Sequence, residues 1–165
     1  MTRAALAVVV LVLVVSTGAK VRADDSIVLP RTKAVLELPP GWKQLDATAL
    51  VAAYRSSNGL VLAITRAQIP NFDAWRDKTR EAYADQIERG AVGAAPGQRR
   101  LARKLRDAGG VPALDLEIRR SDGTTLVVRT LLFRSYTLAL AIEVPRGVTL
   151  DEARRVAMKF APPKA

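Results

Sequence analysis

The sequence lacks two residue types on which much protein chemistry depends: it contains no cysteine and no histidine. Without cysteine, the chain has no disulfide framework, iron–sulfur cluster or thiol nucleophile. Without histidine, it has no Ser-His-Asp triad and no imidazole metal site. It also contains no phosphate-binding glycine loop, G-x-S-x-G elbow or S-x-x-K motif. We therefore expect no catalytic residues, no metal and no cofactor, and we predict that the protein is not an enzyme.

Aromatic residues are also scarce, at 5% of the 165 residues, whereas basic residues are abundant. The 26 Lys and Arg residues outnumber the 16 Asp and Glu residues, so the formal net charge is +10. A hydrophobic content of 49% with 25% charged residues excludes a disordered tail and is typical of a globular domain. The preponderance of arginine over lysine, with abundant alanine and valine, points to a GC-rich bacterial gene.

The N-terminus has the features of a signal peptide. Arg3 precedes an unbroken apolar run of 12 residues, Ala4 to Val15. This run suits a signal-peptide core but is shorter than the roughly 20 residues that span a bilayer. Compact residues stand at the −3 and −1 positions of a site after Ala23. We predict that residues 1–23 are removed and that the product is periplasmic or secreted. The alternatives are an uncleaved anchor or a buried helix.

Residues 24–165 form one predicted domain, because no low-complexity linker or internal repeat divides them. Removal of residues 1–23 takes away three cations and no acid, which leaves 23 cations against 16 acids and a net charge of +7. The mature chain has no cysteine for a lipid anchor and no further apolar run of membrane-spanning length. We therefore expect no transmembrane segment after cleavage.

Alternating apolar and polar residues predict most of the mature chain to be strands. Asn58-Gly59 and the turn at 121–123 are typical of hairpins between such strands. Residues 98–107 are ambiguous between a basic helix and a strand. We favour the strand, because Gly109-Gly110 would then turn it into the next one. The expected strands cover residues 33–38, 50–55, 60–66, 98–107, 111–120, 124–134 and 136–144.

Two segments have helical periodicity instead. Phe72, Trp75, Thr79, Tyr83 and Ile87 fall on one helical face, and Gly90 suits the position after the helix. A second helix is expected near the C-terminus, where Thr149 and Glu152 form a capping-box pattern ahead of an apolar stripe that ends at Phe160. The fold class is therefore α+β: a mostly antiparallel sheet of about six or seven strands with helices packed on its faces.

This order of elements resembles the PsbP-like fold, the α/β/α sandwich that is also found in DcrB-like exported bacterial proteins. The residues that carry the resemblance are the 36–42 segment with its Pro-Pro-Gly-Trp end, the 72–87 helix, the 109–113 segment and the helix that ends at Phe160. The resemblance covers residues 27–161. It implies a small exported domain that acts by binding or by assisting assemblies, without a known reaction.

A cluster of cations is the main candidate binding site: Arg99, Arg100, Arg103, Lys104 and Arg106 place five positive charges within eight residues. Further arginines on the neighbouring strands would extend it into one basic face; these are Arg119, Arg120, Arg129 and Arg134. Such a face attracts an acidic protein or an anionic envelope component. The alternative is an ordinary solvated sheet face. We expect no nucleic acid, because export argues against it and no aromatic residue interleaves the cations.

Trp42 is the second candidate binding residue, because it directly follows a turn. Trp42, Trp75 and Tyr83 would together line a ligand groove, although aromatic residues at such positions more often belong to the core. Asp115 and Glu117 share one face of a predicted strand, and we expect that face to meet water.

Taken together, these features predict an exported, non-enzymatic binding or assembly module that acts on a protein or an anionic envelope partner. The alternative is a carrier that holds a small apolar ligand or lipid between the sheet and a helix.

Overall fold

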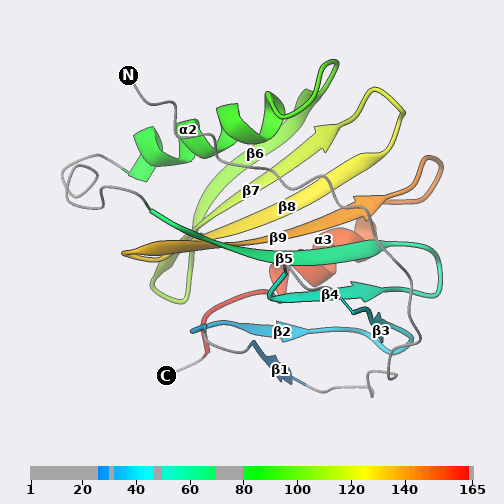
Figure 1. Ribbon diagram of the computed structural model, residues 1–165, viewed down its shortest axis with the longest axis horizontal. Coiled ribbons are helices and arrows are strands. Elements are labelled where there is room, and N and C mark those ends of the chain that lie inside the picture. The colour runs from blue at the N-terminus through cyan, green and yellow to red at the C-terminus, as the bar shows by residue number, and fades with distance from the viewer. Residues whose placement is uncertain (1–25, 30–31, 47–49, 70–79, 164–165) are drawn as a thin grey trace.

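The computed structural model describes residues 26–29, 32–46, 50–69 and 80–163 (Figure 1). The predicted signal peptide lies outside the described residues, as do Phe72, Trp75 and Thr79 of the first predicted helix.

Seven antiparallel strands form the main sheet, in the order β3-β4-β5-β9-β8-β7-β6 (Figure 1). Their bounds are β3 Lys43–Gln44, β4 Ala52–Arg55, β5 Val61–Gln68, β6 Arg99–Ala108, β7 Val111–Arg119, β8 Thr125–Leu132 and β9 Tyr136–Val144. A separate pair is formed by β1 Ser26–Val28 and β2 Val35–Glu37. The predicted α+β class and the predicted antiparallel sheet are confirmed.

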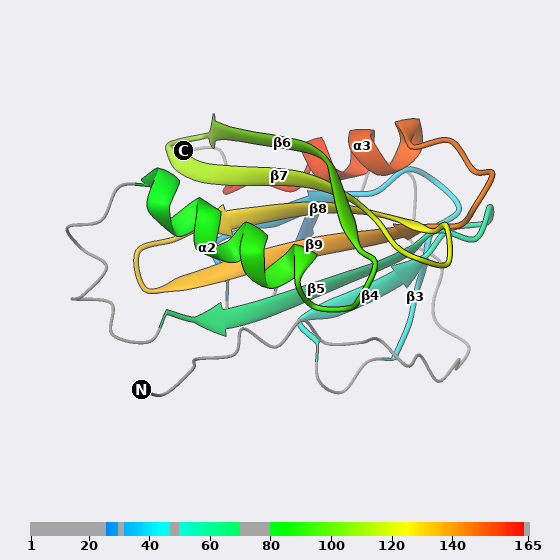
Figure 2. The same ribbon diagram turned by 90° about the horizontal axis from the view of Figure 1, so that it is seen from above.

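Two helices cover opposite faces of this sheet (Figure 2). Helix α2, Arg80–Val92, packs against β6 and β7, and helix α3, Asp151–Met158, packs against β8 and β9. We call the two faces the α2 side and the α3 side. Strands β8 and β9 occupy the middle of the sheet, which explains why their sequences are apolar on both faces.

The larger part of the core lies on the α3 side. There β4, β5, β8 and β9 contribute aliphatic residues that pack against the buried residues of α3 and of the segment after it. The α2 side holds a smaller cluster, in which Ala84 and Ile87 of α2 contact Leu114, Leu116 and Ile118 of β7. Unequal covering of the two sides leaves part of the sheet open, and the candidate site lies there.

The ambiguous segment 98–107 is a strand, as we predicted, and β6 covers Arg99–Ala108. Gly109 and Gly110 have φ angles of 64° and 84°, which suit the two-residue turn between β6 and β7. A register shift between Arg100 and Ala102 interrupts the ladder as a β-bulge. This bulge decides the sides to which Arg99 and Arg100 belong.

Two predicted helix ends are wrong. Helix α2 continues through Gly90 to Val92, so Gly90 does not follow the helix. Leu150 stands at the N-cap of α3 without a side-chain cap, and the Thr149–Glu152 capping box does not form. The Glu152 carboxylate instead accepts hydrogen bonds from Trp42 Nε1 at 3.1 Å and Asn58 Nδ2 at 2.7 Å. The Glu152 carboxylate therefore binds residues that are distant in the sequence instead of capping its own helix.

Candidate functional site

The five cations of β6 are divided between the two sides of the sheet. Arg100 and Arg103 pair across the ladder with residues of β7 whose side chains belong to the α2-side cluster. Lys104 and Arg106 pair with Asp115 and Ala113, which face the α3 side. Alternation along the strand separates Arg103 from Lys104 and Arg106, and the bulge exchanges the sides of Arg99 and Arg100, which precede it. The expectation of one shared basic face is therefore corrected.

Arg99 also falls on the α3 side, directly opposite Arg119. Two like charges at this position repel each other unless solvent or a partner screens them. Arg119 Nη1 donates to the Gly123 carbonyl at 3.4 Å, and Arg120 pairs with Glu143 at 2.7 Å. Arg119 and Arg120 thus have contacts of their own, and among these arginines Arg129 joins the β6 cluster through Asp115.

On the α2 side, the cations are neutralised by helix α2. Arg103 forms ion pairs with Glu81 at 3.1 Å, Asp85 at 2.8 Å and Glu88 at 2.8 Å, and Arg100 also pairs with Glu88. The hydrogen bond that Arg103 donates to the Glu81 carboxylate is the main cause that raises the pKa of the Arg103 guanidinium. Acidic residues at helical spacing thus bind the helix to β6. Arg100 and Arg103 therefore stabilise the packing of α2 on the sheet.

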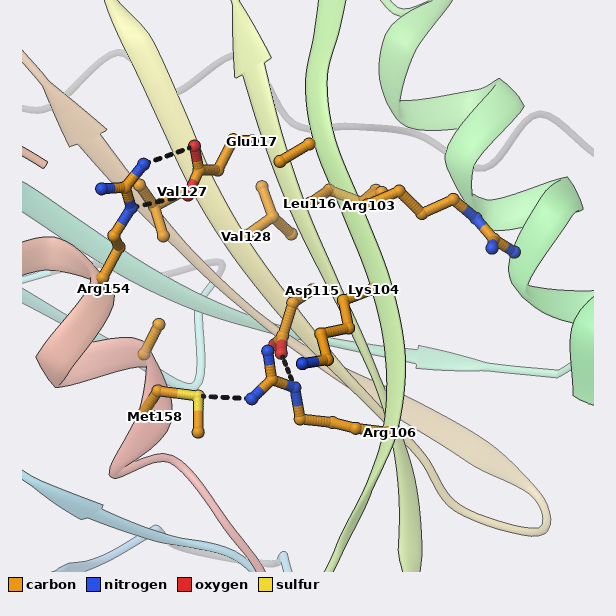
Figure 3. Close-up of a pocket in the computed structure, with 12 residues that line it drawn as sticks. Arg103, Lys104, Arg106, Asp115, Leu116, Glu117, Val127, Val128, Arg154 and Met158 are labelled. Carbon is orange, nitrogen blue, oxygen red and sulfur yellow. Dashed lines mark hydrogen bonds and ion pairs between the residues drawn. The ribbon is translucent and has the colours of Figure 1, made fainter.

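On the α3 side, the sheet is open beside α3 and forms a groove with a volume of about 520 Å³ (Figure 3). Helix α3 covers β8 and β9, and in the described part of the chain no helix packs on the α3 side of β6 and β7. We call this the charged groove. Its apolar lining consists of Ala102, Leu116, Val127, Val128, Ala157 and Met158. Figure 3 shows Lys104 and Arg106 directed toward the groove and Arg103 directed away toward α2.

Asp115 is the central acid of the charged groove. Its carboxylate lies 2.7 Å from Arg106 Nε and 3.5 Å from Arg129 Nε. Burial raises the pKa of Asp115 above its ordinary value, while Arg129, Arg106 and Lys104 act in the opposite direction. Three cations thus surround one acid, and they offset the cost of removing its charge from water.

Arg129 is the most buried charge of the molecule's described part, with 2% of the residue exposed. Burial lowers the pKa of its guanidinium, and Asp115 raises it. Arg129 Nη1 donates to the Ala157 carbonyl at 3.1 Å, in the last turn of α3. That carbonyl also accepts from the Phe160 N–H at 3.1 Å, and a cation at the C-terminal end of a helix is favoured by the helix dipole. Arg129 therefore fixes α3 against the sheet.

Glu117 and Arg154 connect the sheet to α3 across the charged groove. Arg154 Nε donates to Glu117 Oε1 at 2.7 Å, and its Nη2 donates to Oε2 at 3.0 Å, so the contact is bidentate. The side chains of Asp115 and Glu117 are 21% and 17% exposed. The expectation that this pair meets water is wrong, because arginines from β8 and α3 cover it.

Lys104 is the cation of the charged groove that remains available. It is exposed, and among the described residues it takes part in no ion pair. The groove presents three cations, Lys104, Arg106 and Arg154, and the buried Arg129 beside Asp115 adds a fourth, against the two carboxylates of Asp115 and Glu117. Its net charge is therefore +2, beside an apolar floor. Such a surface is suited to an anionic group with an apolar neighbour.

Trp42 lies in the core, with 0% exposure, and its indole N–H donates to Glu152 of α3. Trp42 is therefore a core residue and does not offer a surface to a binding partner. The Pro-Gly turn before it directs the chain inward, beneath α3. Tyr83 is partly buried in the α2-side cluster, on the other face of the sheet. Trp42 and Tyr83 consequently do not line one groove.

Sequence reasoning missed Arg154 and Met158, which α3 contributes to the charged groove. Their spacing was the available signal, since residues 154, 157 and 158 fall on one helical face. Which part of the sheet that face meets depends on the tertiary structure.

In the part of the chain that the structure describes, no group of three or more acidic side chains is arranged to hold a metal ion. No helix there is long and apolar enough to span a bilayer.

No family model and no curated protein sequence matches the chain. Among solved structures, it is similar to the solution structure of cyanobacterial PsbP (CyanoP) from Synechocystis sp. PCC 6803, with a TM-score of 0.59 and 16% identity over 79% of this chain and 87% of that one. A crystal structure from Bacteroides thetaiotaomicron VPI-5482 matches with a TM-score of 0.52 and 11% identity over 87% of this chain. This chain spans 50% of that protein's length. The fold is PsbP-like, as the sequence resemblance predicted.

Proposed function

We propose that the protein is an exported, non-enzymatic binding or assembly module, and that its charged groove holds an anionic segment of a partner. One observation carries the proposal: Lys104 is an exposed cation without an ion pair among the described residues, in a groove of net charge +2. The PsbP-like fold is compatible with this role. A fold by itself does not define a function, so the groove carries the argument.

The groove is organised for binding before a partner arrives. Arg106 is held by Asp115, and Arg154 is held by Glu117 in a bidentate contact. An anion that approaches Lys104 therefore meets guanidinium groups whose rotamers are already restricted, so less entropy is lost on binding. The positive potential of the groove also accelerates the encounter with an acidic partner at low ionic strength. Met158, with its flexible thioether, adapts to an apolar side chain beside the anion.

Charge reversal at Lys104 tests the proposal, with Lys43→Glu as the matched control. Lys43 is an exposed lysine in β3, at the other edge of the sheet, and its substitution changes the net charge by the same amount. We expect Lys104→Glu to weaken binding of fluorescent polyglutamate about tenfold, which corresponds to ~1.4 kcal/mol. Lys43→Glu should stay within about twofold. Equal losses in the two variants would show that only the overall charge matters, and no loss would refute the proposal.

The size of the groove favours a carrier as the second candidate function. A volume of about 520 Å³ falls within the roughly 300–1,000 Å³ of small-molecule sites. The charged border suits an anionic amphiphile better than a purely apolar ligand. Native mass spectrometry of protein purified from its producing cells tests this candidate. A bound lipid of defined mass that Lys104→Glu removes would favour the carrier, and ligand-free protein would count against it.

Export is part of the proposal and has a direct test. The protein is expressed with its full sequence in a Gram-negative bacterium, and the periplasmic fraction is analysed by intact mass spectrometry. We expect a mature chain that begins at Asp24, because Ala23 ends the predicted cleavage site. Ala23→Arg places a large cation at the −1 position and should leave the precursor uncleaved. A cytoplasmic protein of unchanged mass would contradict export.

A further inference from the structure

Strand β6 forms one edge of the seven-stranded sheet (Figure 1), and β7 is its only partner among the described residues. It is ten residues long, whereas β3 at the opposite edge has two residues. A long free edge presents a row of unpaired N–H and C=O groups that another strand can pair with. The charged groove lies over this edge, since Lys104 and Arg106 belong to β6.

The register identifies which backbone groups of β6 are free. Gly109-Gly110 is a two-residue turn, so Ala108 and Val111 on either side of it form a hydrogen-bonded pair. The next pair, Asp107 and Pro112, is then of the non-hydrogen-bonded type. Proline is suited to this position because it has no N–H to donate. The position of Pro112 thus agrees with the alternation of hydrogen-bonded and non-hydrogen-bonded pairs along β6 and β7.

The backbone N–H and C=O groups of Asp107, Leu105 and Arg103 consequently point away from β7, toward the free edge. These three residues are spaced by two, so they offer hydrogen bonds at the repeat of an antiparallel strand. The bulge between Arg100 and Ala102 breaks this regular spacing. The usable edge is therefore the segment 102–108.

The side chains along this edge define what a neighbouring strand must carry. Lys104 and Arg106 face the α3 side, and Leu105 between them faces the α2 side. On the α2 side, Glu81 and Asp85 have side chains that are 58% and 55% exposed. An added strand would place acidic residues favourably beside the two cations, whereas an acidic residue on the α2 side would approach these carboxylates. The matching pattern is acidic, apolar, acidic.

We propose that an extended acidic segment of a partner protein adds to β6 as an antiparallel eighth strand. Its middle residue pairs with the backbone of Leu105, and the two acidic residues that flank it lie over Lys104 and Arg106 at the charged groove. This inference rests on the proposed function and names the occupant of the same site. Backbone hydrogen bonds supply affinity, and the alternating charges select the partner.

The same residues explain why a second copy of this chain is a poor occupant. Strand β6 contains five cations and one acid, Asp107. Two β6 strands side by side would bring like charges into opposition, which destabilises a sheet. A basic edge thus prevents self-pairing and still accepts an acidic strand.

Three synthetic peptides that contain the same amino acids test the proposal by fluorescence anisotropy with the full mature protein. The first contains Glu-Val-Glu-Val-Glu, the second contains the same residues with the three glutamates adjacent, and the third is the first with N-methyl groups on the amides that would face β6. We expect the first to bind about tenfold more tightly than the other two. Equal binding of the N-methylated peptide would overturn the proposal, because that peptide keeps every charge and loses the backbone hydrogen bonds.

Amide hydrogen exchange locates the bound peptide. At about nine-tenths occupancy, exchange at Arg103, Leu105 and Asp107 should slow about tenfold. The amides of Lys104 and Arg106 already face β7 and serve as internal controls that change little. Unchanged exchange at the first three amides would refute strand addition.

A Leu105→Pro variant removes the central outward N–H, and edge strands tolerate proline at such positions. It should bind the first peptide as weakly as the natural protein binds the N-methylated one, with Leu105→Ala as the control that keeps the N–H. Should Leu105→Pro not fold, the N-methylated peptide tests the same hydrogen bond on the natural protein.

The proposed function and this inference fail in distinguishable ways. Loss of polyglutamate binding in Lys104→Glu, together with equal binding of all three peptides, would keep the anionic groove and refute the added strand. No effect of Lys104→Glu on polyglutamate would refute the proposed function itself. Binding to phosphatidylglycerol vesicles without binding to any peptide would replace the protein partner with a membrane surface and refute the inference.

Discussion

On the α2 side of β6, Arg103 contacts three carboxylates of one helix, whereas on the α3 side the neighbouring Lys104 has no ion pair among the described residues. The two residues are adjacent in sequence and have the same charge. They differ in the helix on their side of the sheet, because α2 carries acids at helical spacing and packs against β6, whereas α3 packs against β8 and β9. The number of basic residues in a segment therefore says little about binding until the acids that oppose them are placed.

The largest expected effect concerns the buried charge of the α3 side. Arg129→Met leaves Asp115 with a smaller compensating charge and removes the bond to the Ala157 carbonyl. We expect a loss of about 3 kcal/mol in the free energy of unfolding, measured by urea denaturation. Asp115→Leu combined with Arg129→Met should recover much of the loss, because an apolar pair carries no desolvation cost. A double variant less stable than Arg129→Met alone would contradict this account.

The comparison between the two sides is tested directly by Arg103→Ala and Lys104→Ala. Arg103→Ala should lower the free energy of unfolding by about 1–2 kcal/mol, because it removes the ion pairs that join Arg103 to three carboxylates of α2, among them the largely buried Glu88. Lys104→Ala should change it by less than about 0.5 kcal/mol. Urea is the suitable denaturant, because guanidinium would screen the charges. Equal losses would mean that Lys104 also supports the fold.

A smaller, pH-dependent effect belongs to the α2 side. Burial raises the pKa of Tyr83 from 10.0 to about 12. Between these values the folded protein keeps the phenol proton and the unfolded chain releases it, so stability falls as the pH rises through this window. Tyr83→Phe should remove the tyrosinate absorbance step near pH 12 together with this part of the pH dependence. An unchanged absorbance titration in Tyr83→Phe would refute the assignment.

The smallest effect contrasts two aspartates by NMR titration. Burial raises the pKa of Asp115, whereas hydrogen bonds from Thr124 lower the pKa of Asp122, both relative to 3.8. The contribution of Asp115 to stability is thus present at low pH and is lost as the pH rises through its folded pKa. That of Asp122 is present above its ordinary pKa and is lost as the pH falls. Thr124→Ala should raise the pKa of Asp122 and leave Asp115 unchanged; the reverse order of the two pKa values would contradict the burial argument.

Much of the fold was predictable from local patterns. Alternation identified the long strands, and Gly109-Gly110 resolved the ambiguous segment 98–107 as a strand. The apolar residues on both faces of β8 and β9 agree with their place in the middle of the sheet. These features depend on neighbours in the chain or on the two-residue period of a strand, so the sequence alone is enough to predict them.

The features that failed were those in which local and tertiary contacts compete. Glu152 fits a capping box by spacing, yet Trp42 and Asn58 take its carboxylate. The bulge after Arg100 leaves no residue signature, and it still reassigns the side of every cation before it. For the same reason Trp42, which follows a turn, is buried at α3.

The sequence by itself determined an antiparallel α+β architecture, a surplus of positive charge and the absence of histidine and cysteine chemistry. Only the tertiary structure decided which of those charges is left for a partner. Acids that neutralise Arg103 come from α2, and the cations that cover Asp115 and Glu117 come from β8 and α3. Pairing depends on distances of a few ångströms between segments far apart in the chain, and the composition and periodicity of a single segment do not contain those distances.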